Sequence, residues 1–210
     1  MSDARELYEA VLTGNAKKAQ EITKAALDAG ADPSELLGKQ LIPAMDEVGR
    51  RFECNEYFVP ELLIAARAMK TSLELLAPRL AAAGTKAAGQ VIIGTVKGDL
   101  HDIGKNLVAS MLEGGGFEVV DLGVDVPTEK FVEAAKQREG CIVALSALLT
   151  TTMTMMKSVI EALEKAGLRD STKIMVGGAP ITQQFADEIG ADGYSDNASS
   201  AVALARKLVG

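Results

Sequence analysis

The stretch T-V-K-G-D-L-H-D-I-G-K, residues 95–105, contains His101, the one histidine of the chain. Asp99 stands two residues before His101, Asp102 follows it directly, and Gly104 comes near the end of the stretch. The preceding residues V-I-I-G-T, 91–95, are typical of a buried strand. The one imidazole of the chain thus stands between two carboxylates, at the point where a strand ends.

From residue 90 onward the sequence alternates between expected strands and expected helices. The strands are predicted at residues 91–95, 118–122, 142–146, 173–177 and 193–195, and the helices at 103–112, 129–137, 154–165, 182–189 and 199–208. Three of the strands are continuous apolar runs, as expected for a parallel sheet that is covered on both faces. The pattern predicts an α/β fold with a flavodoxin-like (Rossmann-type) five-stranded parallel sheet.

Ligands of such sheets bind at the carboxyl ends of the strands. His101 follows the first strand, Ser146 ends the third, and Gly177-Gly178 follow the fourth. Two consecutive glycines expose backbone to close approach, which suggests a bulky neighbour. One of the threonines of the run 150–152 is expected to cap the next helix.

The N-terminal part has helical periodicity and almost no strand signal. Residues 32–35, D-P-S-E, offer an acidic N-cap, a proline at the first helical position and a carboxylate at the third. Residues 58–60, F-V-P, open a long helix, and the small residues of 81–89 are typical of a linker. The predicted organisation is an N-terminal helical-bundle cap domain (1–83), a linker (84–89) and an α/β domain (90–210).

The composition narrows the classes of partner. The 210 residues carry a formal net charge of −7, so the chain lacks the basic surface that binds nucleic acid or an anionic membrane. No apolar run reaches the roughly 18 residues of a membrane span, and the N-terminus lacks an apolar signal core. Cys54 and Cys141 are expected to be small buried apolar residues. We therefore expect a cytoplasmic protein with neither a nucleic-acid nor a membrane partner.

Four interpretations of His101 can be compared. It could be a surface histidine, part of a nucleophilic triad, a zinc ligand, or a single axial ligand to the metal of a cofactor. A triad needs an activated nucleophile, and no nucleophile elbow is present. Zinc needs three or four protein ligands, which one histidine and two distant cysteines do not supply. The surface histidine and the axial ligand oriented by Asp99 remain open.

Two other sites that use the same fold are disfavoured by charge. A flavodoxin-type phosphate site would place an anion beside Asp99 and Asp102, which would repel it. A phospho-receiver domain needs an aspartate where Ser146 stands, and a lysine at the end of the fifth strand, where Ser195-Asp196 stand.

Three motifs at fixed spacing resemble a known signature. D-L-H-D-I-G (99–104), then 41 residues, S-A-L (146–148), then 28 residues, and G-G (177–178) look like the cobalamin-binding signature. Methionine synthases, adenosylcobalamin mutases and corrinoid methyl carriers share this signature. V-G-R-R-F-E (48–53) and F-V-P-E-L-L-I-A-A-R-A-M-K (58–70) are similar to the helical cap of the methyl-transferring branch, so the resemblance covers nearly the whole chain.

The resemblance implies a corrinoid cofactor, cobalamin or a related cobamide, with cobalt at its centre. His101 would bind the cobalt on its lower face and displace the corrinoid's own base. Asp99 would accept a hydrogen bond from the other ring nitrogen, and Thr152, where methionine synthase has a serine, would complete the relay. Phe58 would lie over the upper face. The implied cofactor contacts also include Gly98, Asp102, Ile103, Gly104, Ser146, Leu148, Thr150, Gly177, Gly178 and Ala198.

Within this family the length favours a stand-alone carrier. A substrate-binding barrel of roughly 250 residues has no room in the chain. The resemblance thus implies a corrinoid subunit without turnover of its own, similar to those of methanol, methylamine or methoxy-aromatic methyltransferase systems. Its implied partners are a substrate-specific methyltransferase, an acceptor methyltransferase that uses tetrahydrofolate or a thiol, and a reductive activator. The alternative is a corrinoid-binding sensor or storage protein.

Overall fold

The computed structural model describes residues 2–210, with side chains from Arg5 onward. Its contacts divide the chain into two compact units. One contains the residues up to Ala87 together with Glu113–Gly116, and the other contains Ala88–Leu112 and Phe117–Gly210. The finer division into a cap of residues 1–83 and a linker of residues 84–89 stays a prediction.

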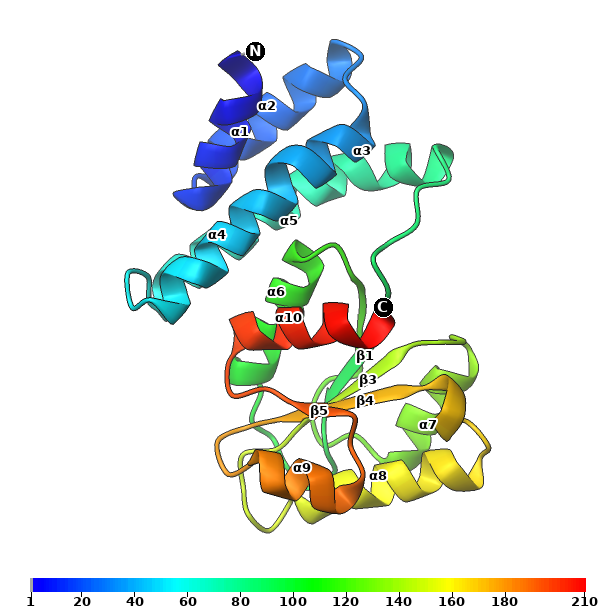
Figure 1. The fold of residues 1–210 in the computed structure, drawn as a ribbon. Helices are drawn as coiled ribbons and strands as arrows, with labels where there is room; N and C mark the ends of the chain where they lie inside the picture. Colours follow the sequence, from blue (N-terminus) through cyan, green and yellow to red (C-terminus); the bar gives the residue numbers. More distant parts are fainter. Residues whose placement is uncertain (1) are drawn as a thin grey trace. The chain divides into compact units, whose positions relative to one another are not determined.

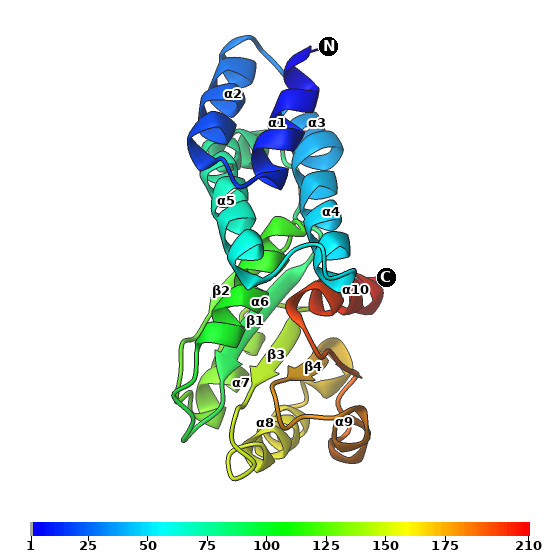
Figure 2. The ribbon, with the colours of Figure 1, turned by 90° about the vertical axis from the view of Figure 1, so that its left-hand side faces the viewer.

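The first unit is built from helices, as its periodicity predicts. Its elements are α1 (Ser2–Leu12), α2 (Ala16–Asp28), α3 (Pro33–Leu36), the π-helical turn η1 (Leu37–Leu41), α4 (Ile42–Glu53) and α5 (Val59–Ala82). Helix α2 packs along α5, and α1 packs against α2 and α4 (Figure 2). The core between the helices is aliphatic, with fully buried Leu7, Leu41, Leu62 and Leu76.

The helix starts follow from local hydrogen bonds. The Asp32 carboxylate accepts a hydrogen bond from the Ser34 N–H at 2.8 Å, which confirms the predicted cap before Pro33. At the start of α5, the Glu61 carboxylate accepts a hydrogen bond from the Phe58 N–H at 2.9 Å. Both contacts satisfy amide groups that the first turn of a helix leaves without a partner.

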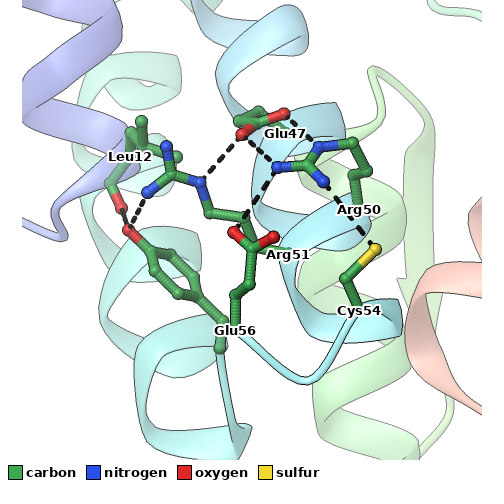
Figure 3. Close-up of polar contacts among 7 residues, drawn as sticks. Leu12, Glu47, Arg50, Arg51, Cys54 and Glu56 are labelled. Carbon is green, nitrogen blue, oxygen red and sulfur yellow. Dashed lines mark hydrogen bonds and ion pairs between the residues drawn. The ribbon is translucent and has the colours of Figure 1, made fainter.

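The turn between α4 and α5 is held by a polar cluster of Glu47, Arg50, Arg51, Glu56 and Tyr57 (Figure 3). Arg50 and Arg51 both donate to the Glu47 carboxylate, at 2.7 to 2.9 Å. Arg51 also donates to the Tyr57 hydroxyl, which donates to the Leu12 carbonyl at the end of α1. The hydrogen bonds from Arg50 and Arg51 lower the pKa of Glu47 from 4.5 to about 2.

The prediction for the cysteines is right for Cys141 and wrong for Cys54. Cys141 is fully buried, whereas Cys54 is exposed, and both thiols are free. Cys54 ends α4, and the next residue, Asn55, turns the chain with a φ of 57°. The thiol therefore leaves the helical core and lies 3.7 Å from the Arg50 guanidinium (Figure 3).

The second unit is an α/β sandwich. Its strands are β1 (Gln90–Thr95), β2 (Glu118–Asp121), β3 (Ile142–Ser146), β4 (Lys173–Gly177) and β5 (Gly193–Tyr194). Its helices are α6 (Ile103–Gly114), α7 (Thr128–Lys136), α8 (Thr154–Lys165), the 3₁₀ turn η2 (Arg169–Ser171), α9 (Gln183–Ile189) and α10 (Ala198–Val209). The strands pair in parallel in the order β2-β1-β3-β4-β5, which confirms the predicted flavodoxin-like sheet.

Helices cover both faces of this sheet. Helices α7, α8 and α9 lie on one face, and α6 and α10 lie on the other (Figure 1). Phe131 of α7 is fully buried, and Gly94 in β1 makes room for it, because a Cβ there would lie 2.8 Å from the ring. Burial of each large apolar side chain contributes about 1.5–3 kcal/mol, so this double-sided core rigidly supports the strand ends. Within residues 2–210, no helix is both long and apolar enough to cross a membrane.

Candidate functional site

The register of the sheet brings three separate motifs to one edge. Thr95 at the end of β1 pairs with Ser146 at the end of β3, and Ser146 pairs with Gly177 at the end of β4. The loops that follow these strands therefore begin side by side. The loop after β1 carries Asp99 and His101.

Asp99 is the centre of this edge. Its side chain is completely buried, yet its carboxylate accepts five hydrogen bonds. Oδ1 accepts from the His101 N–H at 3.1 Å and lies 2.7 Å from the His101 ring atom Nδ1. Oδ2 accepts from the N–H groups of Leu148 and Leu149, at 2.8 and 3.2 Å, and from the Thr152 hydroxyl at 2.7 Å. Two loops far apart in sequence, one after β1 and one after β3, thus converge on one carboxylate.

These hydrogen bonds decide the charge of Asp99. Burial alone raises the pKa of a carboxyl group, but the hydrogen bonds from Thr152, Leu148 and His101 outweigh it and hold the pKa of Asp99 well below its usual range. Asp99 is therefore an ionised acceptor, and the ring atom Nδ1 of His101 must be the donor. The other ring nitrogen, Nε2, then keeps a free lone pair.

The side chain of His101 lies partly at the surface of this edge. Its side chain is 49% exposed, in contrast to the buried Asp99 beneath it. The buried Thr95 hydroxyl donates to the His101 carbonyl at 2.8 Å and so fixes the backbone of the loop. The ring itself is held by Asp99. An imidazole that is held in place with one free nitrogen is suited to be a single ligand to a metal ion whose other ligands do not come from the protein. In the part of the chain that the structure describes, no three His, Cys, Asp or Glu side chains are grouped to hold a metal ion.

Exposed aliphatic side chains flank this histidine. Leu100 and Ile103 are 71% and 82% exposed, and Leu148 and Leu149, whose amides bind Asp99, are also exposed. Single exposed leucines are ordinary, but these four large aliphatic side chains all belong to the segments that follow β1 and β3, which meet at Asp99. The sheet edge therefore offers apolar contacts as well as an imidazole.

Gly177 and Gly178 are glycines because of the chain's own backbone. A Cβ on Gly177 would lie 3.0 Å from the Ser195 carbonyl oxygen. Gly178 has a φ of 134°, and its Cβ would lie 1.9 Å from the Ala147 carbonyl oxygen. The end of β4 therefore packs directly against two neighbouring loops, and the predicted contact of these glycines with a cofactor stays a prediction.

The expected helix cap among the threonines 150–152 is wrong. Helix α8 begins at Thr154, and its N-cap, Met153, makes no side-chain capping hydrogen bond. The buried Thr152 hydroxyl donates to the ionised Asp99 carboxylate at 2.7 Å, a charge-assisted hydrogen bond of the strong kind. Thr150 is exposed in the turn before it.

The remaining predicted residues are distributed around the same edge, with one exception. Gly98 turns the loop before Asp99 with a φ of 84°, Asp102 is exposed, and Gly104 lies in the first turn of α6. Ser146 is partly buried, and Ala198 is buried at the start of α10. Phe58 belongs to the other unit, where its side chain is 60% exposed.

Two polar residues near the site were not predicted from the sequence. Lys105 in α6 is 3% exposed and forms an ion pair with Asp121 at the end of β2. Asp125, in the loop after β2, makes two contacts with the loop that carries His101. A lysine directly after the motif 99–104 was a visible signal for the first, whereas nothing local in the sequence marks the second.

Comparisons with known proteins agree in both halves of the chain. Two family models described as "B12 binding domain" match residues 89–203 and residues 3–77. Trimethylamine corrinoid protein 1 of Methanosarcina acetivorans is 47% identical over 203 residues, which cover 96% of this chain and 94% of that protein. Dimethylamine corrinoid protein 3 of the same organism is 45% identical over 204 residues, or 97% of this chain and 95% of that protein.

A solved structure extends the likeness to three dimensions. A chain in the crystal structure of the methanol:cobalamin methyltransferase complex MtaBC from Methanosarcina barkeri is 31% identical to this chain. The two match with a TM-score of 0.88 over 99% of this chain and 80% of that chain.

Proposed function

The chain belongs to the B12-binding domain family, and we propose that it carries a methyl group on a corrinoid between two methyltransferases. Its cofactor is a corrinoid, the cobalt-containing macrocycle that gives this family its name. The observation that carries the proposal is the hydrogen bond between Asp99 and Nδ1 of His101, since it leaves the lone pair of Nε2 available to bind a metal.

Each residue of the site then has a defined task. When bound, the corrinoid supplies a cobalt centre that accepts a methyl group and gives it up again. His101 would hold this cobalt through Nε2, and Asp99 would keep the ring in the tautomer that leaves Nε2 free. Thr152 anchors the Asp99 carboxylate on the side opposite the ring.

The remaining contacts are proposed from the same arrangement. Leu100, Ile103 and Leu148 would pack against the macrocycle, because they are the exposed aliphatic side chains beside His101. The nucleotide tail would run past the ends of β3 and β4, close to Ser146, Thr150, Gly177, Gly178 and Ala198. Phe58 would cover the upper face of the corrinoid and shield the methyl group.

We infer that the donor partner is a methyltransferase for a methylated amine. The curated relatives at 45% to 47% identity are named for trimethylamine and dimethylamine, whereas the chain from the methanol complex is 31% identical. The acceptor partner would be a second methyltransferase that delivers the methyl group to a thiol or to tetrahydrofolate. A reductive activator would restore the reduced cobalt after accidental oxidation.

Mixing experiments test the carrier role. The reduced corrinoid-loaded protein is combined with trimethylamine and a trimethylamine methyltransferase, and in parallel with methanol and a methanol methyltransferase. We expect methylation of the corrinoid, followed by absorbance, with the amine pair, and its reversal when an acceptor methyltransferase and its thiol are added. An absorbance that stays unchanged with every donor enzyme would overturn the carrier role in favour of a sensor or storage protein.

A further inference from the structure

The loop after β2 makes two hydrogen bonds to the loop that carries His101, and both come from Asp125. The Asp125 carboxylate oxygen Oδ1 accepts from the Gly98 N–H at 2.7 Å. The Asp125 N–H donates to the Asp99 carbonyl at 2.9 Å. Asp125 thus holds the peptide group on each side of the short segment from Gly98 to Asp99.

Asp125 adopts an uncommon backbone conformation to do this. Its φ is 51°, and among residues 2–210 Asn55 is the only other non-glycine residue with a positive φ. Such a conformation costs free energy and persists where the surroundings enforce it. Here the enforcement comes from both flanks, because Gly123 accepts from the Thr95 N–H and Val126 donates to the Thr95 carbonyl, each at 3.0 Å.

A simple turn would not need this side chain. Glycine adopts a positive φ without strain, so the turn alone favours glycine at residue 125. The aspartate adds an acceptor for the Gly98 N–H, at a point where Gly98 itself turns the chain with a φ of 84°. The carboxylate is exposed, and the sheet core does not explain its position. The hydrogen bond from the Gly98 N–H does explain it, because the carboxylate then fixes the backbone directly before Asp99.

We propose that Asp125 is a positioning residue that sets the direction of the His101 lone pair, an inference that rests on the proposed axial role of His101. The Asp99 side chain is fixed from the β3 side by three hydrogen bonds, from the amides of Leu148 and Leu149 and from the Thr152 hydroxyl. Asp125 fixes the Asp99 backbone from the β2 side. The imidazole is therefore held between two independent supports, and a metal ligand must be held to within about 0.5 Å and 10–20° to bind productively.

Two variants separate the contribution of the Asp125 side chain from that of its backbone, and two others are controls. Asp125→Gly keeps the positive φ and the N–H to Asp99 but removes the acceptor for Gly98. Asp125→Asn keeps an acceptor oxygen and tolerates the positive φ but removes the charge. Glu129→Gln, at an exposed acidic residue of α7, controls for the lost charge alone. His101→Ala gives the signal of a cofactor without axial imidazole.

The readout is the electron paramagnetic resonance spectrum of the corrinoid-loaded protein in the cobalt(II) state. In protein produced with nitrogen-15 histidine, the doublet splitting by the axial nitrogen reports the ratio of imidazole-bound to unbound cobalt, because the corrinoid's own base would give a triplet. We expect Asp125→Gly to lower this ratio about tenfold, the usual cost of losing a supporting partner of a metal ligand. Asp125→Asn should restore most of the ratio, and Glu129→Gln should leave it unchanged.

Three results would overturn the inference. An Asp125→Gly protein with the wild-type ratio would exclude a positioning role while leaving the proposed function intact. If the ratio of imidazole-bound to unbound cobalt fell as far in Asp125→Asn as in Asp125→Gly, the hydrogen bond to Gly98 would be excluded as the cause. Absence of the doublet splitting in the wild-type protein would refute the proposed axial ligation itself, and the inference with it.

A second measurement needs no cofactor and therefore decides the matter if Asp125→Gly fails to bind the corrinoid. In the cofactor-free protein, hydrogen exchange of the Gly98 amide reports the contact with Asp125. We expect exchange about tenfold faster in Asp125→Gly than in wild type, with Asp125→Asn close to wild type. Equal exchange rates in Asp125→Gly and wild type would overturn the inference.

Discussion

The imidazole of His101 and the carboxylate of Asp99 lie 2.7 Å apart, although one is half exposed and the other is completely buried. The pair therefore places a negative charge directly behind a surface nitrogen. Two backbone amides and a hydroxyl stabilise the buried charge, so that it need not be neutralised by a proton. The chemistry of the site depends on this arrangement, because an ionised Asp99 determines which ring nitrogen is free.

The Thr152 hydroxyl should contribute measurably to the stability of this arrangement. Thr152→Val keeps the shape but removes the donor, so we expect the free energy of unfolding in urea to fall by about 1.5–3 kcal/mol. Thr152→Ser keeps the hydroxyl and should lose about 1 kcal/mol or less. Thr151→Val, at the exposed neighbour, should stay within about 0.5 kcal/mol of wild type. A Thr152→Val protein as stable as the Thr151→Val control would contradict the account.

The close packing behind Gly178 makes a second prediction. In Gly178→Ala the new methyl group would lie 1.9 Å from the Ala147 carbonyl oxygen, in addition to the strain of a φ of 134°. We expect a loss of about 3 kcal/mol or more in urea unfolding, since strain and overpacking combine. Gly167→Ala is the matched control, because Gly167 has a φ of 71° and nothing within 4 Å of its Cβ. The free energy of unfolding of Gly167→Ala should fall by only about 1–2 kcal/mol. An equal fall in Gly178→Ala would contradict the predicted clash with the Ala147 carbonyl oxygen.

The polar cluster of the helical unit predicts a dependence on pH. The folded pKa of Glu47 lies below its ordinary value of 4.5, at about 2, so its contribution to stability is complete above pH 4.5 and is lost as the pH falls toward 2. Glu47→Gln should therefore be less stable than wild type at neutral pH, and the difference should shrink in acid. Urea unfolding at neutral pH and near pH 3 measures it.

Glu35→Gln is the control for this experiment. Glu35 pairs with Lys39 on an exposed face of the same unit, and such pairs contribute at most about 1 kcal/mol. A Glu47→Gln protein whose deficit stays constant from neutral pH to acid would show that Glu47 acts through packing rather than through its charge.

The fold was predictable because its signals are local. The core strands β1, β3 and β4 are short apolar runs that end in polar or glycine residues, and the predicted ranges of β3 and β4 agree with the structure to the residue. The π-helical turn at Leu37–Leu41 was not predicted, since its residues are ordinary helix formers and nothing in them marks a wider turn. Cys54 was misjudged because the general preference of cysteine for burial was applied without weighing the end of α4.

The candidate site was predictable only where side chains carry it. His101 and Asp99 were singled out from the residues themselves and Thr152 through the resemblance, and the structure brings the three together. The amides of Leu148 and Leu149, which help to keep Asp99 ionised, were out of reach because backbone donors leave no trace in residue type. Asp125 was missed for a related reason: its contacts depend on a positive φ and on the pairing of β1 with β2.

Isotope labelling of the one histidine in the sequence tests the central claim most directly. Protein produced with nitrogen-15 histidine is loaded with a corrinoid, reduced to cobalt(II) and compared with unlabelled protein by electron paramagnetic resonance. Axial ligation by Nε2 of His101 predicts that the nitrogen triplet of the unlabelled sample becomes a doublet. A triplet that persists in the labelled sample would mean that the nitrogen comes from the corrinoid's own base, and would contradict the account.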